Sequence, residues 1–174
     1  FLIVTGISGS GKSSLVRAGV WAALAAGQAP NLPGSDQWLI TAMFPAAQGG
    51  DPFLAFTSSL GQDERFGWLY PGPAANKLKR EPGAFAHLLE RVLAVLPAGA
   101  EWLLVLDQME ELFTPAARDY HDAFLDLLFE SAELNRFRVI ATVRSDFYAD
   151  CELHPGLHEV LNCEGGHYSV RAPG

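Results

Sequence analysis

The sequence predicts an α/β fold in which a mostly parallel sheet of about five strands lies between two layers of helices, a three-layer αβα arrangement. Short apolar runs of strand length alternate with segments whose apolar residues recur at helical spacing, which is typical of βαβ units. One run, residues 102–106, is entirely apolar, as a strand buried on both faces of a parallel sheet requires. A glycine-rich turn joins the first apolar run to the first helical segment.

Five segments have the length and the residue content of strands. In chain order they are residues 1–5, 38–44, 102–106, 138–143 and 168–170. Loop-forming residues interrupt the pattern, among them the Pro, Gly and Asp of residues 31–36.

Six segments are predicted helices, and their ends carry recognisable signals. They are residues 12–26, 51–60, 84–96, 118–134, 145–151 and 155–161. Gly27 is a suitable C-terminal stop for the first helix, and Asp51 and Pro52 suit the N-cap and the first position of the second. Residues 61–82 are the least regular stretch, and we expect a lid or an insertion there.

The composition excludes several classes of protein. The 174 residues suffice for one domain with a sizeable core, so we expect 1–174 to be a single domain. With 49% apolar and 18% charged residues, the chain is too apolar for a disordered segment. The most apolar helical stretch, residues 15–26, is too short for a membrane span and includes Arg17. A net charge of −8 and a pI of about 5.0 argue against a dedicated nucleic-acid binder.

The start of the chain and its cysteines bear on its context. The first residue is not Met and lies within an apolar run without a charged segment before it. We therefore expect a segment of a longer protein rather than a signal peptide. Two cysteines are too few for a disulfide framework, which indicates a reducing compartment and a cytoplasmic location.

The strongest motif is the phosphate loop at residues 6–13, which fits G-x-x-x-x-G-K-[ST] at every fixed position. Its glycines allow backbone N–H groups to converge on a polyphosphate, and the following helix adds its N-terminal N–H groups. Lys12 can reach the β- and γ-phosphates, and the Ser13 hydroxyl can bind Mg²⁺. The alternative is a strand-to-helix turn without a ligand. The nucleotide-binding residues predicted here are Gly6, Ser8, Gly9, Ser10, Gly11, Lys12, Ser13 and Ser14.

Carboxylates follow the apolar run 102–106 directly. Ligands of open α/β sheets bind beyond the carboxyl ends of the strands, where Asp107 can hold Mg²⁺ directly or through water. Glu110 and Glu111 are candidates to orient and deprotonate a water for attack on the γ-phosphate, and we favour Glu110. Alternatively, Asp107 is a plain N-cap and the two glutamates complement the dipole of a helix.

Arg144 ends the fourth predicted strand. If this strand is next to the first, a guanidinium at this position can sense the nucleotide or stabilise transition-state charge. The alternative is a solvated arginine that pairs with Asp146.

No other catalytic or metal motif is evident. The cysteines and histidines near the C-terminal end are irregularly spaced and include no C-x-x-C pair, so zinc is disfavoured. They are Cys151, His154, His158, Cys163 and His167. The sequence has no G-x-S-x-G nucleophile motif.

Together the motifs resemble a known family. The stretch GISGSGKSSLVRAG at 6–19, DQMEELFT at 107–114 and TVRSDFY at 142–148 are similar to those of STAND-class P-loop ATPases. The closest resemblance is to the "novel STAND" group, often joined to WD40 or other repeat domains in bacteria. It spans nearly the whole chain in order.

This resemblance implies a P-loop NTPase core of the additional-strand type, with the fourth strand between the first and third. It also implies that Asp107 is the Mg²⁺ residue of the Walker B motif and that Arg144 is a sensor beside the phosphates. The biology it implies is an ATP-dependent signalling or defence switch that self-associates and is joined to C-terminal repeat or effector domains. The flanking segments that hold adenine in such proteins are absent from this sequence.

Three functions are consistent with these residues. The leading one is a Mg²⁺-dependent ATPase that binds ATP, hydrolyses it slowly and acts as a switch. The second is a scaffold whose bound nucleotide is structural. The third, a phosphotransferase acting on a small acceptor, is disfavoured by the acidic pair beside Asp107.

Overall fold

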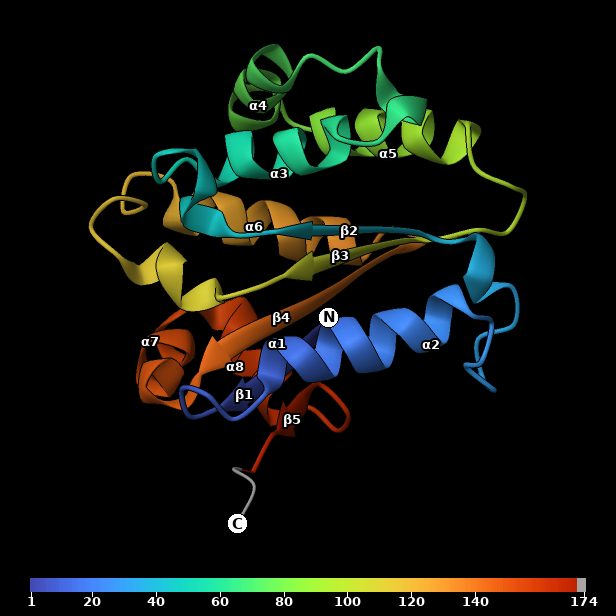
Figure 1. The fold of residues 1–174 in the computed structure, drawn as a ribbon. Helices are drawn as coiled ribbons and strands as arrows, with labels where there is room; N and C mark the ends of the chain where they lie inside the picture. The colour runs from blue at the N-terminus through green and yellow to red at the C-terminus, as the bar shows by residue number, and fades with distance from the viewer. Residues whose placement is uncertain (172–174) are drawn as a thin grey trace.

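The computed structural model describes residues 1–171, which form one parallel sheet with helices on both faces (Figure 1). The strands are β1 (Leu2–Gly6), β2 (Leu39–Met43), β3 (Trp102–Leu106), β4 (Phe137–Arg144) and β5 (His167–Ser169). Each matches a predicted strand to within two residues at either end. The predicted α/β fold with about five strands is therefore confirmed.

The strands lie in the order β2-β3-β4-β1-β5, and every neighbouring pair is parallel. Strand β4 thus lies between β1 and β3, as the family resemblance implies. In register, Gly6 at the end of β1 lies opposite Arg144 at the end of β4. This pairing brings the last residues of the two strands to the same edge of the sheet.

The helices and helical turns connect these strands. They are α1 (Lys12–Ser14), η1 (Leu15–Trp21), α2 (Ala22–Ala25), η2 (Ser35–Gln37), η3 (Pro45–Gln48), α3 (Pro52–Gly61), η4 (Glu64–Phe66), α4 (Pro71–Arg80), α5 (Ala84–Ala94), η5 (Met109–Phe113), α6 (His121–Ala132), η6 (Ser145–Phe147), α7 (Tyr148–Leu153) and α8 (Pro155–Asn162). The first three follow one another without a break and form the helix predicted over 12–26, which ends before Gly27 with its φ of 64°.

Two features differ from the prediction. Residues 61–82 are more regular than expected, because they contain η4 and α4, and α4 packs against α3 and α5, away from the phosphate loop (Figure 1). The first helix contains a π-helical segment, Leu15–Trp21. The spacing of apolar residues over so short a segment does not distinguish a π-helix from an α-helix.

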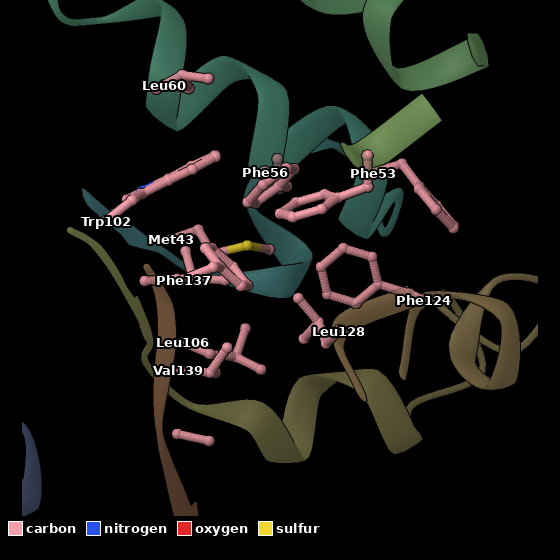
Figure 2. Close-up of a cluster of buried hydrophobic side chains, with 14 of the residues drawn as sticks. Met43, Phe53, Phe56, Leu60, Trp102, Leu106, Phe124, Leu128, Phe137 and Val139 are labelled. Atoms are coloured by element: carbon pink, nitrogen blue, oxygen red, sulfur yellow. The ribbon is translucent and has the colours of Figure 1, made fainter. Parts of the chain in front are cut away.

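One face of the sheet holds the larger core, packed against α3, α5, α6, α7 and α8. Figure 2 shows its aromatic centre, where Phe56 and Phe124 from the helices meet Trp102 and Phe137 from the sheet. The rings of Phe56 and Trp102 stack with centroids 5.4 Å apart. The indole N–H of Trp102 donates to Thr41 Oγ1 at 2.8 Å, so this buried polar group is satisfied.

The opposite face is covered by the helix formed by α1, η1 and α2. Its smaller core consists of Val4, Val16, Leu24, Leu103, Val105 and Ile140. Alternate residues of β3 point to the two faces, since Trp102 and Leu104 belong to the larger core and Leu103 and Val105 to the smaller one. None of the helices within residues 1–171 is both long and apolar enough to cross a membrane.

Candidate functional site

The predicted site residues converge where β1, β3 and β4 end at the same edge of the sheet. The phosphate loop lies between the end of β1 and the start of α1 (Figure 1). Leu106 is in register with Ala141, so Asp107, just after β3, comes beside Thr142 in β4. Neighbouring parallel strands thus bring the three sequence motifs together.

Two kinds of constraint require glycine in the phosphate loop. Gly9 and Gly11 have φ angles of 77° and 87°, which side-chain-bearing residues rarely adopt. Gly6 has no such φ, but a Cβ on it would lie 2.5 Å from Ser10 Oγ and 2.9 Å from the carbonyl oxygen of Val170. The loop therefore depends on backbone conformation at two positions and on close packing at the third.

Lys12 and Ser10 are polar residues buried within the loop. The Lys12 ammonium is held at 2.9 Å by each of two carbonyl oxygens, those of Gly6 and Ile7. The lysine is only 9% exposed. Within residues 1–171, the buried Ser10 Oγ has no hydrogen-bond partner. The loop thus holds a cation and an unused hydroxyl, and both are suited to an anion.

Asp107 is the centre of a buried polar cluster. Its Oδ1 accepts hydrogen bonds from Ser13 Oγ and Thr142 Oγ1, each at 2.7 Å. Its Oδ2 lies 3.3 Å from Arg17 Nε. The aspartate is 2% exposed, and these contacts compensate for the loss of water around its charge. Asp107 is therefore fixed beside the helix that follows the phosphate loop.

Glu110 and Glu111 turn toward different strands. Glu110 Oε2 accepts a hydrogen bond from the backbone N–H of Arg144 at 3.2 Å, which places its carboxylate at the end of β4. Glu111 Oε2 accepts from the backbone N–H of Ala46 at 2.8 Å, beyond the end of β2. Since β4 is next to β1 and β2 is at the far edge of the sheet, Glu110 lies at the end of the strand that neighbours the one leading to the phosphate loop.

Arg144 pairs with Asp146 in this structure. Its Nε and Nη2 donate to the two carboxylate oxygens at 3.0 and 2.6 Å. These bonds raise the pKa of Arg144 and lower the pKa of Asp146, and the charge of Lys12 lowers the pKa of Asp146 further. Arg144 lies opposite Gly6 in the sheet, which is the position that the sensor interpretation requires. Its side chain, however, forms the ion pair with Asp146 that the alternative interpretation predicts.

Comparison with known proteins identifies the family. Residues 1–174 match the family model described as Novel STAND NTPase 1. The chain belongs to the novel STAND NTPase 1 family. No match was found among curated proteins.

The fold of this novel STAND NTPase resembles those of two solved ORC structures. The ORC1 protein of Aeropyrum pernix in complex with DNA superposes with a TM-score of 0.56 at 16% identity, over 98% of this chain and 39% of that one. The Drosophila ORC bound to DNA gives a TM-score of 0.55 at 16% identity, over 88% of this chain and 35% of that one. The chain thus spans less than two fifths of the length of either relative. At such identities the likeness concerns the fold alone.

The oxygen donors of the novel STAND site fit a hard divalent cation. Ser13 Oγ and Asp107 Oδ1 are 2.7 Å apart, and Mg²⁺ prefers hydroxyl, carboxylate and water oxygens. Within residues 1–171, no three His, Cys, Asp or Glu side chains are grouped as metal ligands, so the predicted Mg²⁺ site has a single carboxylate and a hydroxyl as its side-chain donors. Of the irregularly spaced residues near the C-terminal end, His154 pairs with Asp126 and His167 bonds to Thr5 Oγ1.

Sequence reasoning missed two members of the Asp107 cluster. Thr142 is the one polar side chain within the run 139–143, a signal that could have indicated a partner for a charged group on the neighbouring strand. Arg17 follows Ser13 by four residues, so the two share a helix face. Neither role could be assigned until the order of the strands was known.

Proposed function

We propose that this chain is an ATP-binding and slowly hydrolysing switch domain of a signal-transduction or defence ATPase. The observation that carries the proposal is the meeting of Lys12, Ser13 and Asp107 beside a loop of the phosphate-binding type. Membership of an NTPase family supports it. The choice of ATP over GTP as the nucleotide rests on the resemblance to STAND ATPases.

In this proposal the loop binds the polyphosphate through backbone N–H groups and Lys12. The ammonium leaves the carbonyl oxygens of Gly6 and Ile7 to reach the β- and γ-phosphates. Ser8, Ser10 and Ser14 complete the polar lining, and the unpartnered Ser10 hydroxyl gains an acceptor. Ser13 and Asp107 would hold Mg²⁺, which would supply positive charge to offset that of the phosphates.

Glu110 is the proposed base. A carboxylate at the end of β4 can accept a proton from a water that attacks the γ-phosphate, whereas Glu111 is directed toward β2. Arg144 acts as the sensor: its guanidinium leaves Asp146 and binds the γ-phosphate when ATP is present. This exchange is chemically reasonable because both partners offer oxygen acceptors to the guanidinium. Slow hydrolysis is consistent with an arginine that must first leave an ion pair.

A structural nucleotide is the second candidate function. Glu110 already accepts a backbone N–H and Arg144 is already paired, so the same geometry suits a site that binds without turnover. A phosphotransferase is less favoured, because α4 lies within the stretch proposed as a lid and packs on α3 away from the loop.

The wider context is also part of the proposal. We propose a cytoplasmic protein that self-associates and is joined to C-terminal repeat or effector domains, as in the STAND proteins that it resembles. We do not extend the DNA contacts of the two ORC structures to this chain. Its net charge of −8 disfavours a phosphate backbone as partner, and an identity of 16% indicates fold alone.

A binding measurement tests the central claim. We expect Lys12→Ala to weaken ATP binding about a hundredfold, because the phosphates lose a charge-assisted partner. Lys77→Ala is the matched control, since Lys77 is 54% exposed and pairs with Glu81 on the same helix. Calorimetric titration with Mg²⁺-ATP measures both. Equal affinity of Lys12→Ala and wild type would contradict the assignment of the loop.

The choice between switch and scaffold depends on turnover. Phosphate release over many cycles by the full-length protein supports the switch. Tight ATP binding without any release supports the scaffold, because binding and hydrolysis are then separate properties of the site.

A further inference from the structure

Arg17 lies on the same helical segment as Ser13, and both side chains contact Asp107. Ser13 Oγ donates to Oδ1 at 2.7 Å, and Arg17 Nε lies 3.3 Å from Oδ2. Arg17 belongs to the π-helical segment Leu15–Trp21, a type of local widening that occurs often at functional sites. The helix after the phosphate loop thus presents a hydroxyl and a guanidinium to one carboxylate.

Arg17 supplies the positive charge in this cluster. Asp107 is 2% exposed, and its other side-chain partners, Ser13 and Thr142, are neutral hydroxyls. A buried carboxylate without a counter-charge is strongly destabilising. Arg17, by contrast, is 42% exposed, so its own charge stays in contact with water. Moving the guanidinium into water therefore costs far less free energy than leaving the buried carboxylate without a partner.

The guanidinium has a second partner beside Asp107, which it contacts in the same conformation. Its central carbon lies 5.0 Å from the ring centroid of Phe44, a cation–π distance. Arg17, Phe44 and Trp21 line a surface groove of about 490 Å³ along β2. The groove leaves space in which the side chain can move away from Asp107 and remain over an aromatic ring.

We propose that Arg17 is the resident counter-cation of Asp107 and that Mg²⁺ binds in competition with it. The inference rests on the proposed function, in which Ser13 and Asp107 hold Mg²⁺. While Arg17 contacts Oδ2 of Asp107, its positive charge neutralises the carboxylate. A divalent cation that approaches Asp107 is then repelled by the guanidinium. When Mg²⁺ arrives, Arg17 moves into the groove. Arg17 is thus a positioning residue that sets the Mg²⁺ concentration at which the site becomes active.

The test separates charge from hydrogen bonding at position 17. Arg17→Gln removes the charge and keeps an amide donor, whereas Arg17→Lys keeps the charge. MgCl₂ is titrated at constant ionic strength into the protein with ADP, and the thermal unfolding midpoint is followed. We expect the half-effect Mg²⁺ concentration of Arg17→Gln to be on the order of tenfold below that of wild type, and that of Arg17→Lys to remain near it.

Arg91→Gln is the matched control, because Arg91 also lies over an aromatic ring, with its guanidinium carbon 3.6 Å from the centroid of Trp68, on another element. Its Mg²⁺ response should be that of wild type. The inference about Arg17 is overturned if Mg²⁺ stabilises Arg17→Gln and wild type at the same concentration. If ADP and Mg²⁺ stabilise neither protein, the proposed metal site itself is wrong.

A second measurement needs no metal and remains informative if Arg17→Gln folds poorly. Without Mg²⁺, we expect Arg17→Gln to have a lower unfolding midpoint than wild type. Asp107→Asn in the same chain should restore most of the loss, because the neutral amide needs no counter-cation. An equal loss with and without Asp107→Asn would show that Arg17 only packs, and would overturn the inference.

Discussion

At the scale of the residue, Asp107 shows how one buried charge fixes several neighbours. Its partners come from the helix after the phosphate loop and from β4, so the carboxylate joins elements that are far apart in the chain. The next residue, Gln108, has φ 59° and ψ 52°, a left-handed conformation that is uncommon for a side-chain-bearing residue. Its N–H donates to Thr142 Oγ1 at 3.0 Å, which helps to hold the turn. This turn sends Glu110 toward β4.

The two glutamates give a residue-scale prediction. We expect Glu110→Gln to keep ATP affinity and to lower kcat about a hundredfold, because the amide cannot accept the proton of the attacking water. Glu111→Gln is the matched control, and we expect nearly wild-type turnover, since its partner is the N–H of Ala46 beyond β2. Phosphate release with saturating ATP measures both. The reverse ranking would transfer the role of the base to Glu111.

At the scale of the element, the sequence predicts best where local signals and packing agree. The strand at 102–106 was predicted with its observed bounds, because a wholly apolar run suits only a buried strand. Asp51 caps α3 as predicted, with its Oδ1 accepting from the N–H groups of Phe53 and Leu54. Both elements are determined by residues within or next to them.

Helix α4 was missed because its own sequence does not favour it. It begins with Pro71-Gly-Pro, which is typical of a turn, and only Ala75 and Leu78 are buried. Its stability comes from other elements, since it packs on α3 and α5 and Lys79 bonds to Asp51 at the start of α3. The helix is amphipathic, but its turn-like start and its many polar residues mask this pattern in the sequence.

The link between α3 and α4 gives an element-scale prediction. Asp51 Oδ2 lies 2.5 Å from Lys79 Nζ, which is 4.3 Å from the centroid of the Tyr120 ring. We expect Asp51→Ala to cost about 2 kcal/mol of unfolding free energy, because both the cap and the ion pair are lost. Asp51→Asn, which keeps a capping oxygen, should cost about half as much. Urea unfolding measures both.

Lys79→Met keeps the cap and removes the ion pair together with the contact of the ammonium with the Tyr120 ring, so its loss should be at least that of Asp51→Asn. Hydrogen exchange should show faster opening of α4 in all three variants. Unchanged protection of α4 would mean that the ion pair does not hold it.

At the scale of the whole molecule, the two faces of the sheet have unequal support. The core on one face takes residues from α3, α4, α5, α6, α7 and α8, whereas the helix after the phosphate loop covers the other face (Figure 1). The sequence predicted the motifs at the shared edge of the sheet. It offered the Arg144–Asp146 pair only as one of two alternatives, and it could not predict that Glu110 and Glu111 diverge or that Arg17 reaches Asp107. These contacts depend on the order of the strands and on side-chain directions, which no local pattern determines.

The larger core also contains a thiol that couples global stability to pH. Cys151 in α7 is fully buried, and burial raises its pKa from 9.0 to about 12, with smaller contributions from Asp150 and Glu110. In the unfolded chain the thiol ionises near its ordinary value. The folded state therefore retains its proton over a range in which the unfolded state loses it. The contribution of Cys151 to stability is complete below about pH 9 and is lost as the pH rises toward 12.

Cys151→Ala should remove this part of the pH dependence. We expect the unfolding free energy of wild type to fall between about pH 9 and pH 10.5 by roughly 2 kcal/mol more than that of the variant, at about 1.4 kcal/mol per pH unit. Urea unfolding across this range measures the difference, with Cys163→Ala as the control because Cys163 is exposed. That control should keep the wild-type slope. Parallel curves for Cys151→Ala and wild type would mean that the thiol gains access to water before the protein unfolds, and that the core beneath α7 opens locally.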